Sequence, residues 1–290
     1  MVLHSTLRPP LVSVGDLAAT HDPDVRVVDV RWLLGQPGAG RIAYDAGHIP
    51  GAIFLDVDAD LVAHEGPGRH PLPEPGVFAQ GLAASGIGDS SFVVAYDDVG
   101  GWVAARLWWM LDDLGQTDVA VLDGGWQAWV GEDLPTDSIE PDPPPEPASL
   151  HLGTAWRKVI DREALKPRLG SLVLLDARAG ERYRGEIEPI DPIAGHIPTA
   201  RSAPTGGNLR PDGRFLPAPE LRARFEGLGC VAPGGTVTSC GSGVSACHNA
   251  LAMRIAGLPD PLLYPGSYSD WSRSGEMVAV GVEPGAPPGF

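Results

Sequence analysis

The chain has 290 residues, of which 43% are hydrophobic and 20% are charged, as in many soluble globular proteins. Its formal net charge of −16 argues against binding to nucleic acid or to an anionic membrane. The sequence shows no signal peptide, no apolar run of about 18 residues and only three cysteines. These features predict a cytoplasmic protein without a structural disulfide, a metal site or a cofactor.

Short apolar runs alternate with helical stretches along the chain. In chain order, strands are expected at 25–30, 91–96, 119–122, 172–175 and 236–239, with helices at 104–114 and 244–255. The strand runs are continuously apolar, which is typical of parallel strands buried on both faces. We therefore predict an α/β fold with parallel sheets flanked by helices on both faces, and ligand chemistry at the carboxyl ends of the strands.

The second half of the sequence repeats the first. The segment AGHIP at 46–50 recurs at 194–198, an offset of 148, and VVDVR at 27–31 resembles LLDAR at 174–178, an offset of 147. Two further matches follow in the same order: 94–97 with 237–240, and 124–126 with 266–268. Ordered matches at nearly constant offsets indicate a duplicated module of roughly 140 residues.

A proline-rich stretch separates the two copies. Residues 140–147 read EPDPPPEP, and proline both fixes φ and removes a hydrogen-bond donor, so an extended linker is expected. We place an N-terminal domain at 1–140, the linker at 141–149 and a C-terminal domain at 150–290.

Cys240 is the candidate nucleophile. It follows an expected strand directly and opens the loop CGSGVSA, after which a helix is expected. Gly241 and Gly243 allow successive backbone N–H groups to converge on one point, and the helix N-terminus adds partial positive charge. Such a loop favours the thiolate, which is the reactive form of cysteine. The equivalent residue of the first copy is Asp97, so only the second domain is expected to be catalytic. A buried structural cysteine is the alternative interpretation.

The loop of residues 240–246 resembles the active-site loop of 3-mercaptopyruvate sulfurtransferases, and the whole chain resembles the tandem rhodanese family to which they belong. The GHIP elements, RLWWM at 106–110 and DGGW at 123–126 extend this resemblance over nearly all of the chain. It implies a ping-pong reaction in which Cys240 takes sulfur from a donor as a persulfide and passes it to a thiol or to cyanide. A thioredoxin-like reductant is one such acceptor.

The resemblance also implies roles for individual residues. Arg182 is expected to bind the anionic end of the donor, and Ser242 to activate the donor together with His48. Since His196 occupies the place of His48 in the second copy, a purely structural turn is the alternative for His48. The other residues expected to contact the donor are Gly241, Gly243, Val244, Ser245, Trp32 and Trp102, the two tryptophans from a cleft between the domains.

The donor itself is left open by the sequence. Asp191 stands where mercaptopyruvate enzymes of the family have a second arginine, and a carboxylate there is expected to repel a keto acid. Gly241 and Ser242 are neutral, however, and offer little to the dianion thiosulfate. We therefore place 3-mercaptopyruvate first, with thiosulfate and a non-catalytic persulfide carrier as alternatives. A phosphatase of the C-x5-R type is excluded, because Ala246 occupies the position of its arginine.

Overall fold

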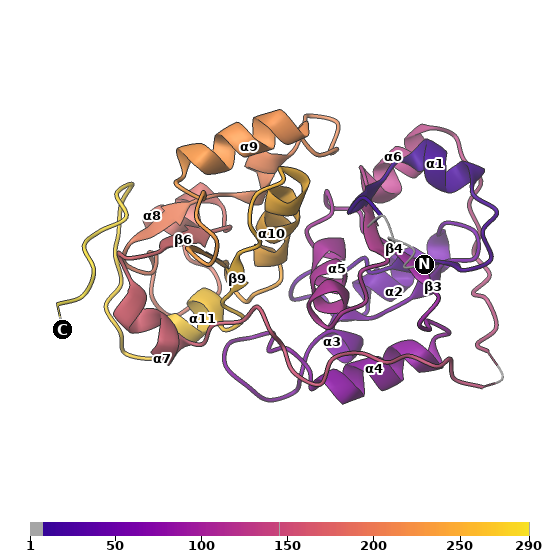
Figure 1. Cartoon of the computed structure of the whole chain (residues 1–290), viewed down its shortest axis with the longest axis horizontal. Helices are drawn as coiled ribbons and strands as arrows, with labels where there is room; N and C mark the ends of the chain where they lie inside the picture. Colours follow the sequence, from indigo (N-terminus) through magenta and orange to yellow (C-terminus); the bar gives the residue numbers. More distant parts are fainter. Residues whose placement is uncertain (1–7, 145, 290) are drawn as a thin grey trace, which may run out of the picture. The chain divides into compact units, whose positions relative to one another are not determined.

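The computed structural model describes residues 8–144 and 146–289, which form two compact units (Figure 1). The first unit comprises the chain up to Leu61, Glu74–Arg157 and Asp212–Arg214. The second comprises Val62–Pro73, Lys158–Pro211 and the chain from Phe215 onward. Two short segments therefore belong to a different unit from their neighbours in sequence, whereas the predicted division at 141–149 is linear. Residue 145 of the predicted linker lies outside the described residues.

A five-stranded parallel sheet forms the centre of the first unit, with strand order β1-β5-β4-β2-β3. Its strands are β1 Leu11–Val12, β2 Val25–Asp29, β3 Ile53–Phe54, β4 Phe92–Tyr96 and β5 Val119–Leu122. Its helices are α1 Val14–Ala19, α2 Ala39–Ala46, α3 Val57–Asp60, α4 Pro75–Ala84, α5 Ala104–Asp113 and α6 Gly125–Gly131. Every residue of β4 is buried, as the continuous apolar run predicts for a central strand covered on both faces.

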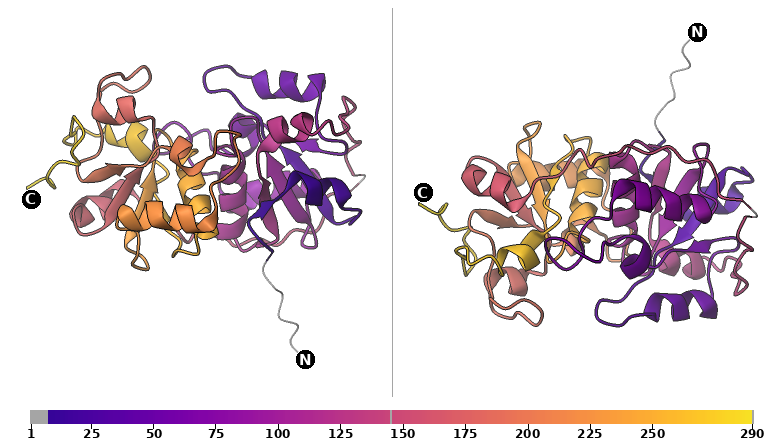
Figure 2. Two further views of the ribbon diagram at one scale, coloured as in Figure 1. Left: turned by 90° about the horizontal axis from the view of Figure 1, so that it is seen from above. Right: turned by 90° about the horizontal axis from the view of Figure 1, so that it is seen from below.

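The second unit repeats this design with a four-stranded parallel sheet of order β7-β6-β8-β9 (Figure 2). Its strands are β6 Val173–Asp176, β7 Ala200–Ser202, β8 Thr236–Ser239 and β9 Leu262–Leu263. Its helices are α7 Arg162–Leu165, α8 Gly180–Arg184, α9 Ala218–Gly227, α10 Ala246–Ile255 and α11 Ser267–Trp271, with short 3-10 helices at Lys166–Arg168 and Thr205–Asn208. Helices α9 and α10 pack together on one side of the sheet, and α7 and α11 lie on the other (Figure 1).

The duplication inferred from sequence is visible in the matching strand orders. Strands β2, β3, β4 and β5 correspond in position to β6, β7, β8 and β9. The predicted α/β fold with two tandem modules is confirmed. The predicted helix at 244–255 is observed from Ala246 to Ile255, with Ser245 as its N-cap.

Within the described residues, no helix is long and apolar enough to cross a bilayer. The same part of the chain holds no group of three or more His, Cys, Asp or Glu side chains arranged to bind a metal ion.

Candidate active site

Cys240 begins the loop between β8 and α10 and is 2% exposed. Its sulfur accepts hydrogen bonds from two backbone N–H groups, that of Gly243 at 3.1 Å and that of Ser242 at 3.4 Å. The close turn requires glycine at 243, since a Cβ there would lie 2.5 Å from the carbonyl oxygen of Pro265 in addition to the positive φ. The loop therefore forms the anion-binding nest that its glycines predict.

The start of α11 holds this loop in place. The Ser267 hydroxyl accepts the backbone N–H of Cys240 at 3.0 Å and donates to the carbonyl of Tyr264 at 2.8 Å. The backbone N–H groups of Tyr268 and Ser269 donate to the carbonyls of Cys240 and Gly241 at 3.0 and 2.9 Å. Both flanks of the nucleophile are thus fixed by backbone contacts, as a preorganised site requires.

The segment of residues 62–73 brings two further side chains to the loop. Gly68 lies so close to α11 that a Cβ on it would be 2.5 Å from the carbonyl oxygen of Gly266, and the next N–H, that of Arg69, donates to Ser269 Oγ at 3.0 Å. His70 Nδ1 then lies 2.7 Å from Ser242 Oγ, and both residues are buried. A hydroxyl and an imidazole at this distance can exchange a proton.

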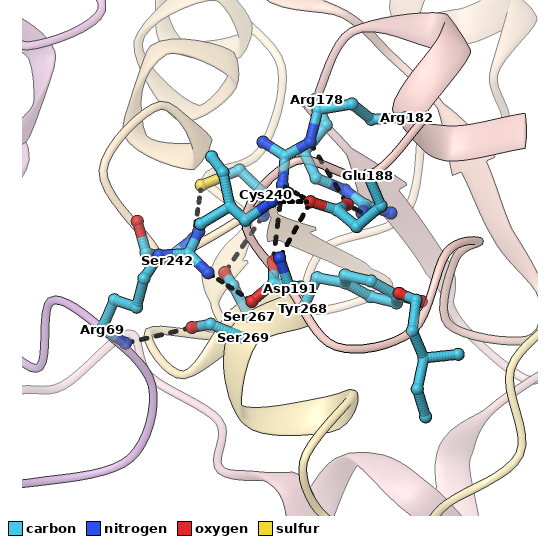
Figure 3. A network of polar contacts seen from close by, with 12 residues as sticks. Arg69, Arg178, Arg182, Glu188, Asp191, Cys240, Ser242, Ser267, Tyr268 and Ser269 are labelled. Carbon is cyan, nitrogen blue, oxygen red and sulfur yellow. Dashed lines mark hydrogen bonds and ion pairs between the residues drawn. The ribbon is translucent and has the colours of Figure 1, made fainter. Parts of the chain in front are cut away.

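A cluster of arginines and carboxylates lies near Cys240 (Figure 3), and three of its arginines come within 4 Å of a Cβ placed on Gly241. Arg182 bonds to Glu188 Oε1 at 2.7 Å through Nη2 and to Glu188 Oε2 at 3.2 Å through Nε. Arg178 makes a bidentate contact with Asp176 and stacks over the Tyr268 ring at 3.8 Å. Because every carboxylate is paired, the cluster can present cationic groups without leaving a buried charge alone.

These contacts set the protonation of the cluster. Burial opposes ionisation of Glu188, but the hydrogen bonds from Arg182 and from two backbone N–H groups hold the pKa of its carboxyl below the usual range. Burial also opposes the charge on Arg178, yet Asp176 and Glu188 raise the pKa of that guanidinium. In contrast, burial raises the pKa of the Cys230 thiol, so this cysteine stays protonated and unreactive near neutral pH.

The histidine bonded to Ser242 is His70, whereas sequence reasoning paired Ser242 with His48. The His48 ring stacks on Tyr44 at 3.8 Å, and its Nδ1 donates to the Tyr44 carbonyl at 2.9 Å. The second copy repeats this arrangement, with His196 stacked on Tyr183 at 3.8 Å and donating to the Tyr183 carbonyl at 2.8 Å. A contact made identically in the copy with and the copy without a nucleophile is a feature of the turn, and it supports the structural interpretation of the GHIP element.

The other predicted residues are placed as follows. The loop itself contains Gly241, Gly243 and Val244, which are buried, and Ser245, which is half-buried. Arg182 lies next to the loop and is also half-buried. Trp32 and Trp102 contact each other edge-to-face in the first unit, with centroids 6.1 Å apart, and their contact with the donor stays a prediction.

Sequence reasoning missed Arg69 and His70, although a signal existed. The run GRHPLP at 68–73 has a counterpart in GRFLP at 213–217, which is a further match between the two copies. In both copies, part of this segment belongs to the other unit: 62–73 to the second and 212–214 to the first. This match between the two copies, with the adjacent basic residues Arg69 and His70 in the first copy, would have identified them as candidate site residues.

The site places the sulfur of Cys240 among backbone N–H donors with guanidinium groups beside it, an arrangement typical of cysteine-dependent enzymes that act on anionic substrates. The family model of the rhodanese-like domain matches this chain twice, at residues 15–132 and 161–274. A Pseudomonas aeruginosa protein named "Probable 3-mercaptopyruvate sulfurtransferase" is 46% identical over 274 residues, covering 90% of this chain and 94% of that protein.

Two further relatives agree. The thiosulfate sulfurtransferase of Rattus norvegicus is 32% identical, with 94% of this chain and 95% of that protein covered. The structure of 3-mercaptopyruvate sulfurtransferase from Leishmania major superposes with a TM-score of 0.81 at 34% identity, covering 90% of this chain and 74% of that one. The chain belongs to the rhodanese family, in tandem arrangement, and the predicted class of sulfurtransferase is confirmed.

Proposed function

We propose that this enzyme transfers sulfur from 3-mercaptopyruvate to a thiol or to cyanide through a persulfide on Cys240. The observation that carries the proposal is the buried Cys240 sulfur, which accepts two backbone N–H groups next to the Ser242–His70 pair. None of the three cysteines, all within the described residues, forms a disulfide, which suits a cytoplasmic setting and acceptance of the sulfur by a thioredoxin-like dithiol.

In the first half-reaction the Cys240 thiolate attacks the donor sulfur. A sulfur–sulfur bond forms on Cys240 while the bond between sulfur and the methylene carbon breaks, and its electron pair passes into the enolate of pyruvate. The thiol proton of the donor ends on that carbon, giving pyruvate and an anionic persulfide. Ser242 and His70 form the pair that carries this proton. The acceptor thiolate or cyanide then attacks the outer sulfur and restores Cys240.

The donor preference rests on this proton. 3-Mercaptopyruvate must lose a thiol proton when its sulfur is transferred, whereas thiosulfate carries none, so a buried Ser–His pair is useful only for the first donor. Thiosulfate is the second candidate. It is favoured by the arginines beside Gly241, which would suit a dianion, and by the name of the rat relative.

Intact-mass measurement after treatment with each donor tests the proposal. The full chain should gain the mass of one sulfur atom from 3-mercaptopyruvate. Cys240→Ser should abolish the gain, and Cys230→Ser and Cys247→Ser, which remove the other two thiols, should retain it. A gain that persists in Cys240→Ser would overturn the assignment. A higher kcat/KM with thiosulfate would reverse the donor preference, and no gain with either donor would favour a non-catalytic module.

A further inference from the structure

Two arginines from distant parts of the sequence converge on the residue after the nucleophile. A Cβ placed on Gly241 would lie 2.8 Å from Arg69 Nη2 and 3.6 Å from Arg182 Nη1. The absence of a side chain at 241 therefore leaves a space that is bordered by two guanidinium groups. This space adjoins Cys240, so whatever occupies it is positioned next to the sulfur.

Each guanidinium is held from its far side. Arg182 is held through Nε and Nη2 by Glu188 and Asp191, and Arg69 is held through Nη1 by Asp191. Among the described residues Arg69 Nε is buried and has no hydrogen-bond partner. The space at Gly241 is thus bordered by Arg69 Nη2 and Arg182 Nη1, which do not bond to these carboxylates. Arg69 Nε is a further buried donor, without an acceptor in the described part of the chain.

Asp191 is the common anchor of this arrangement. Its side chain is fully buried, and its two oxygens contact Arg69, Arg182 and Arg273. From the sequence, a carboxylate at 191 was expected to repel an anionic donor. In the structure these arginines neutralise the charge of Asp191, and two of them, Arg69 and Arg182, also border the space at Gly241.

We propose that Arg69 is a donor-binding residue that, with Arg182, clamps the carboxylate of an α-keto acid donor, and that Asp191 positions it. A planar carboxylate can accept N–H donors from Arg69 Nη2 and Arg182 Nη1 on its two oxygens, whereas a single cation would leave it free to rotate. The inference rests on the proposed function, since it assigns a donor-binding residue to that reaction.

Kinetics with 3-mercaptopyruvate test the role of Arg69. Arg69→Ala should raise KM by about 10- to 100-fold and change kcat by less than about threefold, because binding of an unreactive group is lost. Arg69→Lys, which keeps the charge but not the planar fork, should fall between the two. Pyruvate, the desulfurated product, should lose potency as a competitive inhibitor in the same order, which reports binding without turnover.

Arg273→Ala is the matched control. Arg273 contacts the same Asp191 oxygen at 3.0 Å but is half-exposed and also bonds to the Ser269 carbonyl. Its loss should leave KM within about threefold of the parent, as for an exposed ion pair. Asp191→Asn should raise KM with kcat preserved, since it loosens Arg69 without removing it.

The outcomes separate this inference from the proposed function. An unchanged KM and unchanged pyruvate inhibition in Arg69→Ala would overturn the inference while Cys240 still gains sulfur. An equal rise in KM for Arg273→Ala would also overturn it. If the parent protein gains no sulfur from 3-mercaptopyruvate, it is the proposed function that fails.

Discussion

His70 and Ser242 meet across 172 residues of sequence, and their buried contact next to Cys240 is the pair that we propose carries the thiol proton of the donor. His70→Ala should therefore lower kcat with 3-mercaptopyruvate by about 10²- to 10⁴-fold. With thiosulfate, which has no thiol proton, the loss should be much smaller. Steady-state rates with the two donors, at fixed cyanide, measure this difference.

His48→Ala is the comparison. This change removes a buried ring stacked on Tyr44 and should lower thermal stability, while kcat of the folded protein is retained. Equal losses with both donors in His70→Ala would show that His70 supports the fold rather than proton transfer.

The sequence predicted those residues of the candidate site that lie together in one short motif. Cys240, Gly241, Ser242 and Gly243 lie within one loop between a strand and a helix, and the chemistry follows from that short pattern. Arg69 and His70 could not be found in this way. Their role depends on a segment of one half joining the other unit, which hydrophobic periodicity does not report.

Among the elements, the loop after β4 shows what the nest looks like when an anion of the protein itself fills it. Asp97 stands at the position of Cys240, and its carboxylate accepts four backbone N–H groups, from Val99, Gly101, Val103 and Ala104, at 2.8–2.9 Å. The first unit thus keeps the geometry of the nest, but its backbone N–H groups are taken by the side chain of Asp97.

Asp97→Ala should destabilise the first unit by about 2–4 kcal/mol, because four N–H groups, three of them in buried contacts, lose their acceptor. Urea unfolding followed by tryptophan fluorescence measures this, since seven of the eight tryptophans lie in residues of the first unit. Asp98→Ala, next to it and only partly buried, should cost less than about 1 kcal/mol. Equal midpoints for the Asp97→Ala and parent proteins would refute a structural role for the filled nest.

Element prediction succeeded where packing alone decides the structure. The strand predicted at 119–122 is observed with those bounds, because a buried parallel strand needs a continuous apolar run. The two-residue strands β1 and β3 carry too few residues to show any pattern. They are strands because β5 and β2 supply partners for their backbone.

For the molecule as a whole, the second unit is not encoded by the second half alone. A fragment of residues 148–290 lacks the 62–73 segment, and with it Arg69 and His70. We expect this fragment to lose at least about 100-fold in kcat/KM with 3-mercaptopyruvate, since both donor binding and proton transfer are affected.

The full chain with Arg69→Ala and His70→Ala together is the control for misfolding of the fragment. It retains the segment backbone and should lose activity to a similar extent while unfolding at a normal temperature. A fragment with full activity would show that the second half is self-sufficient.

The exchange of the 62–73 segment also fixes when the enzyme can begin to work during its synthesis. Arg69 and His70 are synthesised about 200 residues before α11, a delay of about 10–40 s at ordinary elongation rates. The first unit can fold in that interval, but residues 62–73 lack their partners Asp191, Ser242 and Ser269 until the second half, including α11, has been made. Assembly of the proposed reactive site therefore waits for α11, and a chain interrupted before Ser267 lacks the hydrogen bonds that α11 makes to residues 69 and 240.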